Sequence, residues 1–403
     1  MARGLRDALK WLALGVGVAC LAGTASAWFL LALAWATETR EAHRWLLALL
    51  PVAGFAVGWA YLRWGQAVEA GNNLLIDEVH DPRRVVPLRM APLIFLSTVI
   101  SHLCGASVGR EGTAVQMGGS LADQFTHLLR LPVEDRPVLL MAGISAGFAS
   151  VFGTPLAGVV FGIEVVATAR LRLATLWPCL VAAVVADQVC TLWGVHHGAY
   201  SAGVMPSLSA GTLGAAVMVG LLCGLVAMAF VRGTHGLLAF MKHRVAYAPL
   251  RSLLGGTLLA GVIWTTDAWR YAGLSLPGLA QAFSEPLPWW DFALKGLFTS
   301  FCLGVGFKGG EVTPLFYMGA TLGNALAPLL QQPFSWLAAL GFVAVFAGAA
   351  NTPLTCTLMA MELFGVGIGV HAALACMVSY LASGRVGIYR AQRLVSSKYR
   401  WRR

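Results

Sequence analysis

Residues 109–119 read GREGTAVQMGG, and residues 309–319 read GGEVTPLFYMG. Aligned at an offset of 200 (311 − 111), the two segments share four residues: Gly109, Glu111, Thr113 and Gly119 match Gly309, Glu311, Thr313 and Gly319. A second pair, FASVFGTPLAGVVFGIE at 148–164 and FAGAANTPLTCTLMAME at 346–362, matches at an offset of 198 (362 − 164). Because both matches include a glutamate and fall at nearly one offset, they indicate an internal duplication, with its boundary between about residue 200 and residue 250.

The composition around these segments is that of an integral membrane protein. Hydrophobic residues make up 58% of the 403 residues and charged residues only 11%, and the mean hydropathy is +0.72. Soluble domains carry roughly 25% charged residues. We therefore expect an all-α polytopic membrane protein, in which an ionisable residue such as Glu111 is costly to bury and is a candidate for function.

The second pair of segments also predicts broken helices. Gly153-Thr154-Pro155 interrupts one apolar stretch and Asn351-Thr352-Pro353 interrupts the other. Proline suits the first turn of a helix and disrupts its interior, so we expect one helix to end and another to begin at each break, at mid-membrane depth. Glu164 and Glu362 follow the two breaks at equal distances, which suggests a structural pair that satisfies the duplicated loops.

Basic residues gather at both ends of the chain, at Arg3, Arg6 and Lys10 and in the tail 384–403. The positive-inside rule then places both termini in the cytoplasm of a multi-pass protein in the cell membrane, and nucleic-acid binding is not expected.

The apolar stretch from residue 11 to 36 exceeds the apolar core of a signal peptide and predicts a retained spanning helix. The basic stretch 230–252 predicts a cytoplasmic loop. The cysteines occur singly, so we expect neither a zinc site nor disulfides.

Four segments combine glycine or proline with polar residues: GNNLL (71–75), GREGT (109–113), GEVTP (310–314) and GIYRAQ (387–392). A helix N-terminus that follows such a turn carries bare N–H groups and about +0.5 charge, so several converging ends would bind an anion. Neutral donors are available from Asn72, Asn73, Thr113, Thr313 and Tyr389. Simpler interpretations remain open, since Asn72 suits a helix cap and Tyr389 suits the headgroup level.

The GREGT segment closely resembles the GREGP motif of the CLC chloride channels and proton-coupled antiporters. The GTPLAG break, the GxxxP segment before a helix and a tyrosine in the last helix extend the resemblance over most of the chain. The resemblance implies a single CLC-type transmembrane domain over 1–403, with inverted-topology repeats at about 11–200 and 208–390 and no soluble domain after them. It also implies homodimers with one pore per subunit and no cofactor or metal, and it makes Glu111 the gating residue.

The departures from the family pattern resemble its fluoride-specific branch. Asn72 stands where chloride and nitrate members typically carry the serine of GSGIP, Thr113 replaces the proline of GREGP, and Glu311 replaces the isoleucine of GIFAP. The resemblance implies a fluoride/proton antiporter that exports fluoride, in which Glu111 exchanges with the anion and Glu311 is a station for the proton. The expected anion ligands are Asn72, Asn73, Gly112, Thr113, Val312, Thr313 and Tyr389.

The alternatives to a fluoride/proton antiporter belong to different classes of protein. A chloride or other anion channel or exchanger of the same family is the nearest, followed by an intramembrane enzyme with Glu111 or Glu311 as general base, and by a scaffold protein. For Glu311 the sequence also allows a structural ion pair with Lys308 or an arginine. Fluoride is a strong hydrogen-bond acceptor, so a site that strips its water must offer short, strong donors, which an amide and a hydroxyl supply.

Overall fold

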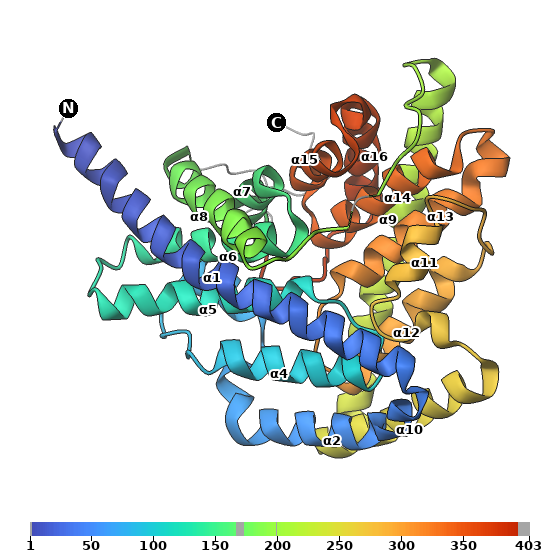
Figure 1. The fold of residues 1–403 in the computed structure, drawn as a ribbon, viewed down its shortest axis with the longest axis horizontal. Coiled ribbons are helices and arrows are strands. Elements are labelled where there is room, and N and C mark those ends of the chain that lie inside the picture. Colours follow the sequence, from blue (N-terminus) through green and yellow to red (C-terminus); the bar gives the residue numbers. More distant parts are fainter. Residues whose placement is uncertain (1, 167–172, 199, 394–403) are drawn as a thin grey trace.

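The computed structural model describes residues 2–166, 173–198 and 200–393 (Figure 1). The elements of the first half are α1 Ala2–Ala42, η1 Arg44–Leu49, α2 Leu50–Ala60, η2 Tyr61–Gly65, η3 Gln66–Val68, α3 Asn72–His80, α4 Met90–Leu103, α5 Glu111–Leu128, α6 Arg136–Phe152, α7 Pro155–Glu164 and α8 Leu173–Leu192. Those of the second half are α9 Ala210–Arg244, α10 Ala248–Thr266, η4 Trp269–Tyr271, α11 Leu276–Gln281, α12 Asp291–Val305, α13 Val312–Leu330, α14 Phe334–Ala350, α15 Pro353–Phe364, η5 Val366–Ile368 and α16 Gly369–Ala382.

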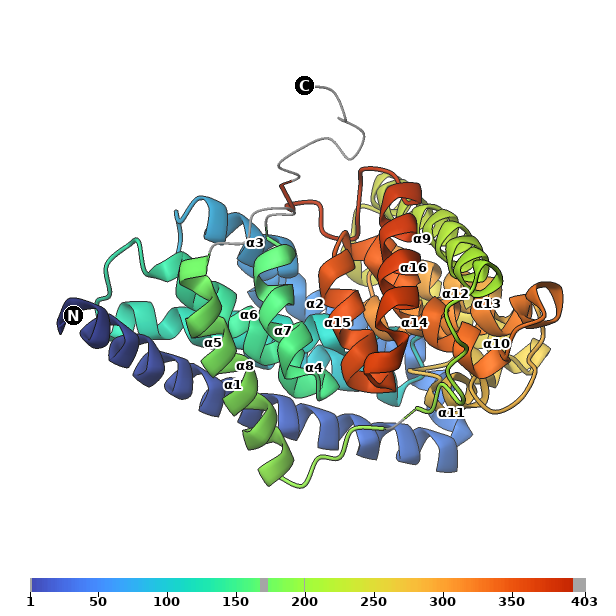
Figure 2. The same cartoon turned by 90° about the horizontal axis from the view of Figure 1, so that it is seen from above.

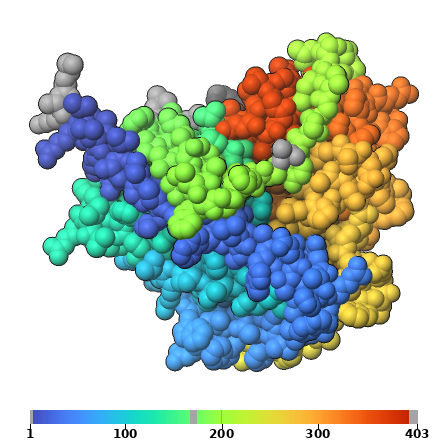
Figure 3. Space-filling model, in the orientation of Figure 1, coloured from blue at the N-terminus to red at the C-terminus, as the bar shows by residue number. Residues whose placement is uncertain are grey.

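The order of helices confirms the duplication. The succession α4, α5, α6, α7 recurs about 200 residues later as α12, α13, α14, α15. In the space-filling view the first half, blue to green, covers most of the left of the visible face, and the second half, yellow to red, covers most of the right (Figure 3). The boundaries of the repeats at 11–200 and 208–390 stay a prediction.

The repeated segments of the two halves contact each other. Gly109 and Gly310 form an antiparallel bridge, in which the Gly310 N–H donates to the Gly109 carbonyl at 2.8 Å. A Cβ on Gly109 would lie 2.9 Å from the Gly310 carbonyl oxygen, so the bridge requires glycine there. The rings of Phe148 and Phe346 also stack, with centroids 6.4 Å apart. The two motifs of the duplication are therefore also neighbours in space.

The helices break where the sequence predicts. α6 ends at Phe152, Gly153 takes a left-handed conformation (φ 70°), and α7 begins at Pro155. α14 ends at Ala350, Asn351 takes the same conformation (φ 57°), and α15 begins at Pro353. Each break leaves a bare helix N-terminus inside the protein, so its N–H groups need a partner.

Glu164 and Glu362 supply those partners reciprocally. The Glu362 carboxylate accepts the N–H groups of Leu156 (2.9 Å) and Ala157 (2.8 Å) at the start of α7. The Glu164 carboxylate accepts the N–H groups of Leu354 (3.1 Å) and Thr355 (2.8 Å) at the start of α15, and the Thr355 hydroxyl at 2.7 Å. α7 and α15 lie side by side in the middle of the molecule (Figure 2). The expected structural pair is confirmed.

Glu164→Ala is expected to lower the free energy of unfolding by about 3 kcal/mol, because it leaves two N–H groups and a hydroxyl without their acceptor in the interior. Thermal unfolding in detergent measures the loss. Glu134→Ala, in the exposed loop before α6, is the matched control and should unfold with the parent. A Glu164→Ala protein as stable as this control would contradict the capping role.

The basic segments differ in part from their expected structure. The stretch 230–252 is not a loop, since α9 continues to Arg244 and α10 begins at Ala248. No proline interrupts 230–244, and Lys242, His243 and Arg244 occupy the last turn, where the helix dipole favours cations. The second half of the basic tail, from residue 394 on, lies outside the described residues.

Helix lengths agree with a protein that crosses a membrane several times. Four helical stretches of the described chain are long and apolar enough to span a bilayer: Gly4–Ala42, Arg44–His80, Ala174–Leu192 and Ala210–Arg244. The first of them contains the stretch 11–36, which forms part of one continuous helix. The shorter helices, including α6, α7, α14 and α15, pack between the longer ones and carry the central breaks.

Candidate functional site

Glu111 is the first residue of α5, and its carboxylate reaches the N-terminus of α13. One carboxylate oxygen, Oε2, accepts the backbone N–H of Thr313 at 3.0 Å and that of Arg110 at 3.2 Å. The other, Oε1, accepts the Thr313 hydroxyl and lies 3.5 Å from Arg110 Nε. The side chain is almost fully buried, with 1% of the residue exposed. A negatively charged oxygen therefore occupies the N–H cradle at the start of α13.

The local sequence explains this cradle. Gly309 and Gly310 bring the chain close to Gly109, and α13 begins immediately afterwards at Val312, with Glu311 as its N-cap residue. The first N–H groups of the helix have no partner within the helix, and the macrodipole adds partial positive charge there. Thr313 contributes its hydroxyl to the same point, so the cradle suits a small anion as well as a carboxylate.

Two cavities have lining residues at or next to the start of α5. A cavity of about 570 Å³ is bordered by Asn72, Asn73, Glu311 and Tyr389. A narrow cavity of about 40 Å³ is bordered by Arg110, Glu111 and Thr313 together with Tyr200 and Phe316. The carboxylate of Glu111 thus faces the narrow cavity, whereas the next residue, Gly112, faces the groups of the wide one. Glu111 and Gly112, neighbours at the start of α5, therefore lie close to the linings of two different cavities.

Asn72 and Glu311 meet at Gly112. A Cβ on Gly112 would lie 3.1 Å from Asn72 Nδ2 and 4.0 Å from Glu311 Oε2. Asn72 is the first helical residue of α3, Gly71 is the N-cap residue, and Asn72 makes no side-chain capping bond. Its Oδ1 is buried without a hydrogen-bond partner among the described residues. Helix capping therefore does not explain Asn72, whose donor atom Nδ2 is the one that lies at the Gly112 turn.

The neighbouring candidates are partly engaged by protein groups. Asn73 Oδ1 accepts the N–H of Ala391 at 2.9 Å, which ties α3 to the chain after α16. The Thr113 hydroxyl shares a 2.8 Å hydrogen bond with the hydroxyl of Thr98 on α4, in contrast to the Thr313 hydroxyl, which binds Glu111. The two repeats are therefore not equivalent at the site, in accord with different roles for Glu111 and Glu311.

Tyr389 differs from its expected setting. Within the described residues it lies in an irregular stretch after α16 and not in a helix, because Ser383, Gly384 and Gly387 interrupt the chain there. Only 4% of the residue is exposed, and its ring centroid is 6.4 Å from that of Phe161. This burial does not fit a tyrosine of a lipid-facing aromatic belt. The tyrosine faces the wide cavity together with Glu311.

Glu311 has no close cation. Among the described residues, no lysine, arginine or histidine nitrogen lies within 4.0 Å of its carboxylate, and Lys308 Nζ instead lies 4.0 Å from the ring centroid of Tyr61. The cation–π contact with Tyr61 is favourable without any carboxylate. The alternative of a Lys308–Glu311 ion pair therefore finds no support in the geometry.

Some residues at the site were not expected from the sequence. They are Thr98, which binds Thr113; Gln116, beside Gly71; Tyr61 under Lys308; and Tyr200 and His197 at the narrow cavity. Their only signal is a polar side chain within an apolar helix or beside a glycine turn, which many residues of the chain share. Elsewhere, no cluster of three or more metal-ligating side chains occurs in the part of the chain that the structure describes.

The chain is similar to several known proteins. Residues 53–384 match the model of a family described as voltage gated chloride channel. A chloride/fluoride channel protein of Pseudomonas syringae pv. tomato is 59% identical over 396 residues, which are 97% of this chain and 88% of the relative. An H(+)/Cl(−) exchange transporter of Cronobacter sakazakii is 27% identical over 85% of this chain and 79% of its own length. A crystal structure of a CLC-type fluoride/proton antiporter superposes with a TM-score of 0.93 at 30% identity, covering 96% of this chain and 98% of that one.

Proposed function

The chain belongs to the voltage gated chloride channel (CLC) family, and on that premise we propose that it is a fluoride/proton antiporter that exports fluoride. Family membership makes it an anion channel or transporter and not an enzyme. Fluoride is supported by the name of the 59% identical relative, and proton coupling by the similar antiporter structure. The observation that carries the proposal is the Glu111 carboxylate in the cradle of Thr313.

The mechanism follows from what that cradle binds. While it is deprotonated, Glu111 fills the N–H and O–H groups at the start of α13 and closes the path between the two cavities. Protonation removes the charge that holds it there, so the side chain leaves and fluoride takes its place. Release of the proton on the other side returns the carboxylate. Each exchange then moves fluoride and a proton in opposite directions.

Glu311 is proposed to pass the proton between Glu111 and the wide cavity. It borders that cavity, it has no ion-pair partner among the described residues, and its Oε2 comes within 4.0 Å of a Cβ position on Gly112, next to Glu111. Burial disfavours an unpaired carboxylate relative to its protonated form, which suits a group that holds a proton transiently.

The anion ligands proposed beside Glu111 are neutral donors. They are Asn72, Asn73, Thr113, Thr313 and Tyr389, with the backbone N–H groups of Gly112 and Val312. Asn72 offers Nδ2 at the Gly112 turn, and Thr313 already donates its N–H and its hydroxyl to the two oxygens of the Glu111 carboxylate. Short donors of this kind offset the loss of fluoride hydration better than an apolar cage does.

A passive channel is the second candidate, because the 59% identical relative is named a channel. Efflux from liposomes that contain the purified protein separates the possibilities. The proposal expects fluoride efflux that far exceeds chloride efflux from matched liposomes and that is accompanied by proton uptake. Equal efflux of the two anions would contradict fluoride selectivity, and fluoride efflux without protons would establish a channel.

The setting of the protein in the cell membrane is also a proposal. We place both termini in the cytoplasm because Arg3, Arg6 and Lys10 lie at the N-terminal end of α1, before its apolar stretch 11–36, and the tail is rich in arginine. The CLC resemblance supports a homodimer in which each subunit has its own pore.

Asn72→Ser is expected to lower the ratio of fluoride to chloride flux by about tenfold, because it removes the carboxamide donor beside Gly112 and substitutes the smaller hydroxyl. Selectivity is a difference between two affinities, so both anions must be measured in the same liposomes. Asn73→Ser is the neighbouring control, since the Asn73 Oδ1 already binds Ala391, and it should change the ratio less. An unchanged ratio in Asn72→Ser would show that this carboxamide does not select the anion.

A further inference from the structure

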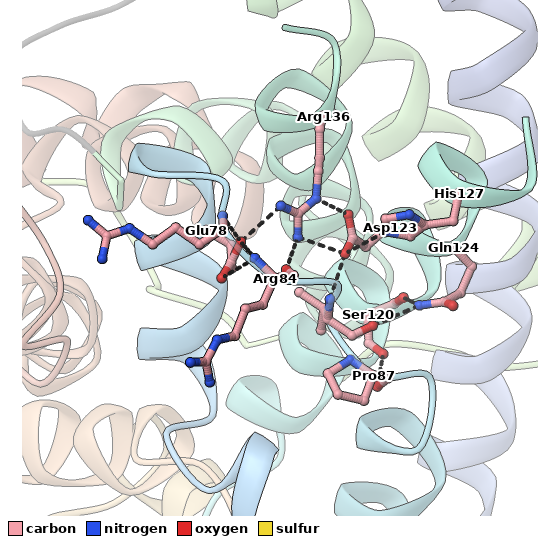
Figure 4. A network of polar contacts seen from close by, with 10 residues as sticks. Glu78, Arg84, Pro87, Ser120, Asp123, Gln124, His127 and Arg136 are labelled. Carbon is pink, nitrogen blue, oxygen red and sulfur yellow. Dashed lines mark hydrogen bonds and ion pairs between the residues drawn. The ribbon is translucent and has the colours of Figure 1, made fainter. Parts of the chain in front are cut away.

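Arg136, the first residue of α6, is the centre of a buried polar network far along the chain from the gate (Figure 4). Its Nε and Nη2 donate to the Asp123 carboxylate at 2.7 and 3.0 Å, and its Nη1 donates to Glu78 at 2.9 Å. Nη2 also donates to the carbonyl of Arg84, and Glu78 accepts the N–H groups of Arg83 (2.9 Å) and Arg84 (3.1 Å). The network fixes the loop 81–89 and engages both acids.

A cavity of about 370 Å³ lies beside this network, between the loop 81–89 and the turn after α5. Its border is strongly basic, with Arg83, Arg84, His127, Arg130 and Arg136. Arg83 pairs with Asp81 at 2.5 Å, and Arg136 pairs with the two buried acids. Arg84 and Arg130 have no carboxylate within 4.0 Å among the described residues. The cavity therefore has an excess of positive charge without a protein counter-ion.

Arg130 occupies a backbone conformation that glycine would take more easily. Its φ is +50°, and it follows the last turn of α5, where the N–H of Leu131 donates to the Thr126 carbonyl at 2.9 Å. This is the position after a helix at which glycine is favoured, and another residue there costs of order 1 kcal/mol or more. Arg130 therefore destabilises the backbone relative to glycine, and its side chain borders a basic cavity. These two observations point to a role for its guanidinium.

Exposed apolar side chains lie at or near the same cavity: Val85 and Val133 border it, and Leu128 and Leu129 precede Arg130 in the chain. Leu128, Leu129, Val133 and Val85 are 80%, 52%, 66% and 49% exposed. Lys10 of α1 forms an ion pair with Asp135 in the adjacent turn, and Trp177 Nε1 donates to the carbonyl of Ala8 at 3.4 Å. Tryptophan, lysine and arginine beside exposed leucine and valine are typical of the level at which lipid headgroups meet water.

We propose that the cavity between the loop 81–89 and the turn 129–135 binds a phosphate ester, supplied by the headgroup of an anionic phospholipid. Arg84 and Arg130 would donate to the phosphate oxygens, because guanidinium groups match phosphate geometry with two parallel N–H bonds. The exposed leucines and valines would contact the acyl chains. A free phosphate ion has the same chemistry for the two arginines but gains nothing from the apolar rim.

The test uses the whole protein, purified in a neutral detergent, and its thermal unfolding with added dioleoyl phosphatidylglycerol, dioleoyl phosphatidylcholine or inorganic phosphate. Phosphatidylglycerol should raise the unfolding temperature and phosphatidylcholine should not. The variant with both Arg84→Gln and Arg130→Gly should bind phosphatidylglycerol about tenfold more weakly or worse. Arg89→Gln is the control, since Arg89 is exposed in the same loop but does not border the cavity.

The single variant Arg130→Gly separates an effect on lipid binding from an effect on the stability of the protein itself. Glycine relieves the left-handed conformation, so without lipid this variant should unfold at or above the parent temperature, and with phosphatidylglycerol its stabilisation should shrink. If phosphatidylglycerol raised the unfolding temperature of the double variant as much as that of the parent, the proposed site would be wrong. It would also be wrong if phosphatidylcholine raised the unfolding temperature of the parent as much as phosphatidylglycerol does. Stabilisation by inorganic phosphate as large as that by phosphatidylglycerol would retain the phosphate site and exclude the lipid as its particular source.

Discussion

Liposomes that contain Glu111→Gln should show no proton movement driven by fluoride, above the level of liposomes without protein. The amide of glutamine still accepts the N–H of Thr313 through its oxygen, so the helix N-terminus keeps a partner and the fold is retained. However, the amide can neither gain nor lose the transported proton, and it carries no charge whose removal would release it. Fluoride efflux and internal pH, recorded together, measure both halves of the exchange.

Two controls make the Glu111→Gln result specific. Thermal unfolding should match that of the parent to within a few degrees, which shows that the variant is folded. Glu134→Gln, on the exposed loop before α6, should transport at the parent rate. Fluoride-driven proton movement at the parent rate in Glu111→Gln would exclude Glu111 as the proton-coupled gate.

Glu311→Gln should stop the exchange or separate fluoride flux from proton flux, in a protein of parent stability. Both parts of this expectation come from the structure. The carboxylate faces the wide cavity near Gly112, so its loss breaks the proposed proton route. No cation among the described residues pairs with it, so the amide leaves no buried charge uncompensated, and the several kcal/mol cost of breaking a buried ion pair does not arise.

Glu69→Gln is the matched control for Glu311. Glu69 borders the same cavity, but its side chain is about half exposed and lies 3.6 Å from Lys242. Glu69→Gln therefore removes the same charge from the cavity as Glu311→Gln does, but from a residue that does not lie next to Gly112. Coupled exchange should persist in this variant. Parent-rate exchange in Glu311→Gln would refute the proton station, and a marked loss of thermal stability would instead favour a structural role.

The sequence predicted those features that depend on local chemistry. The proline and glycine breaks at 153–155 and 351–353 end helices by backbone sterics alone, and the repeated glutamates identified the two cross-capping residues. The start of α5 at Glu111 and of α13 at Val312 followed from the glycines before them. These predictions needed no knowledge of which helices pack together.

Features that depend on packing between distant segments could not be predicted. Lys308 lies over Tyr61, and Thr113 binds Thr98 on α4, because α4 and the residues after α2 happen to pack at those points. The basic stretch 230–252 was wrongly expected to be a loop: most of it is helical, since polarity alone does not end a helix such as α9 that has no proline or left-handed residue. Tyr389 was placed in a helix by resemblance, but glycines precede it.

Simultaneous measurement of fluoride and internal pH in liposomes tests the central claim most directly. Liposomes loaded with fluoride and containing the parent protein are diluted into fluoride-free buffer, with the membrane potential held near zero by potassium and valinomycin. The interior is made slightly more acidic than the buffer at the start. If fluoride leaves in exchange for protons, the interior acidifies further, against the proton gradient, and Glu111→Gln abolishes the effect. Fluoride efflux through the parent protein with no uphill acidification would contradict antiport and identify a channel.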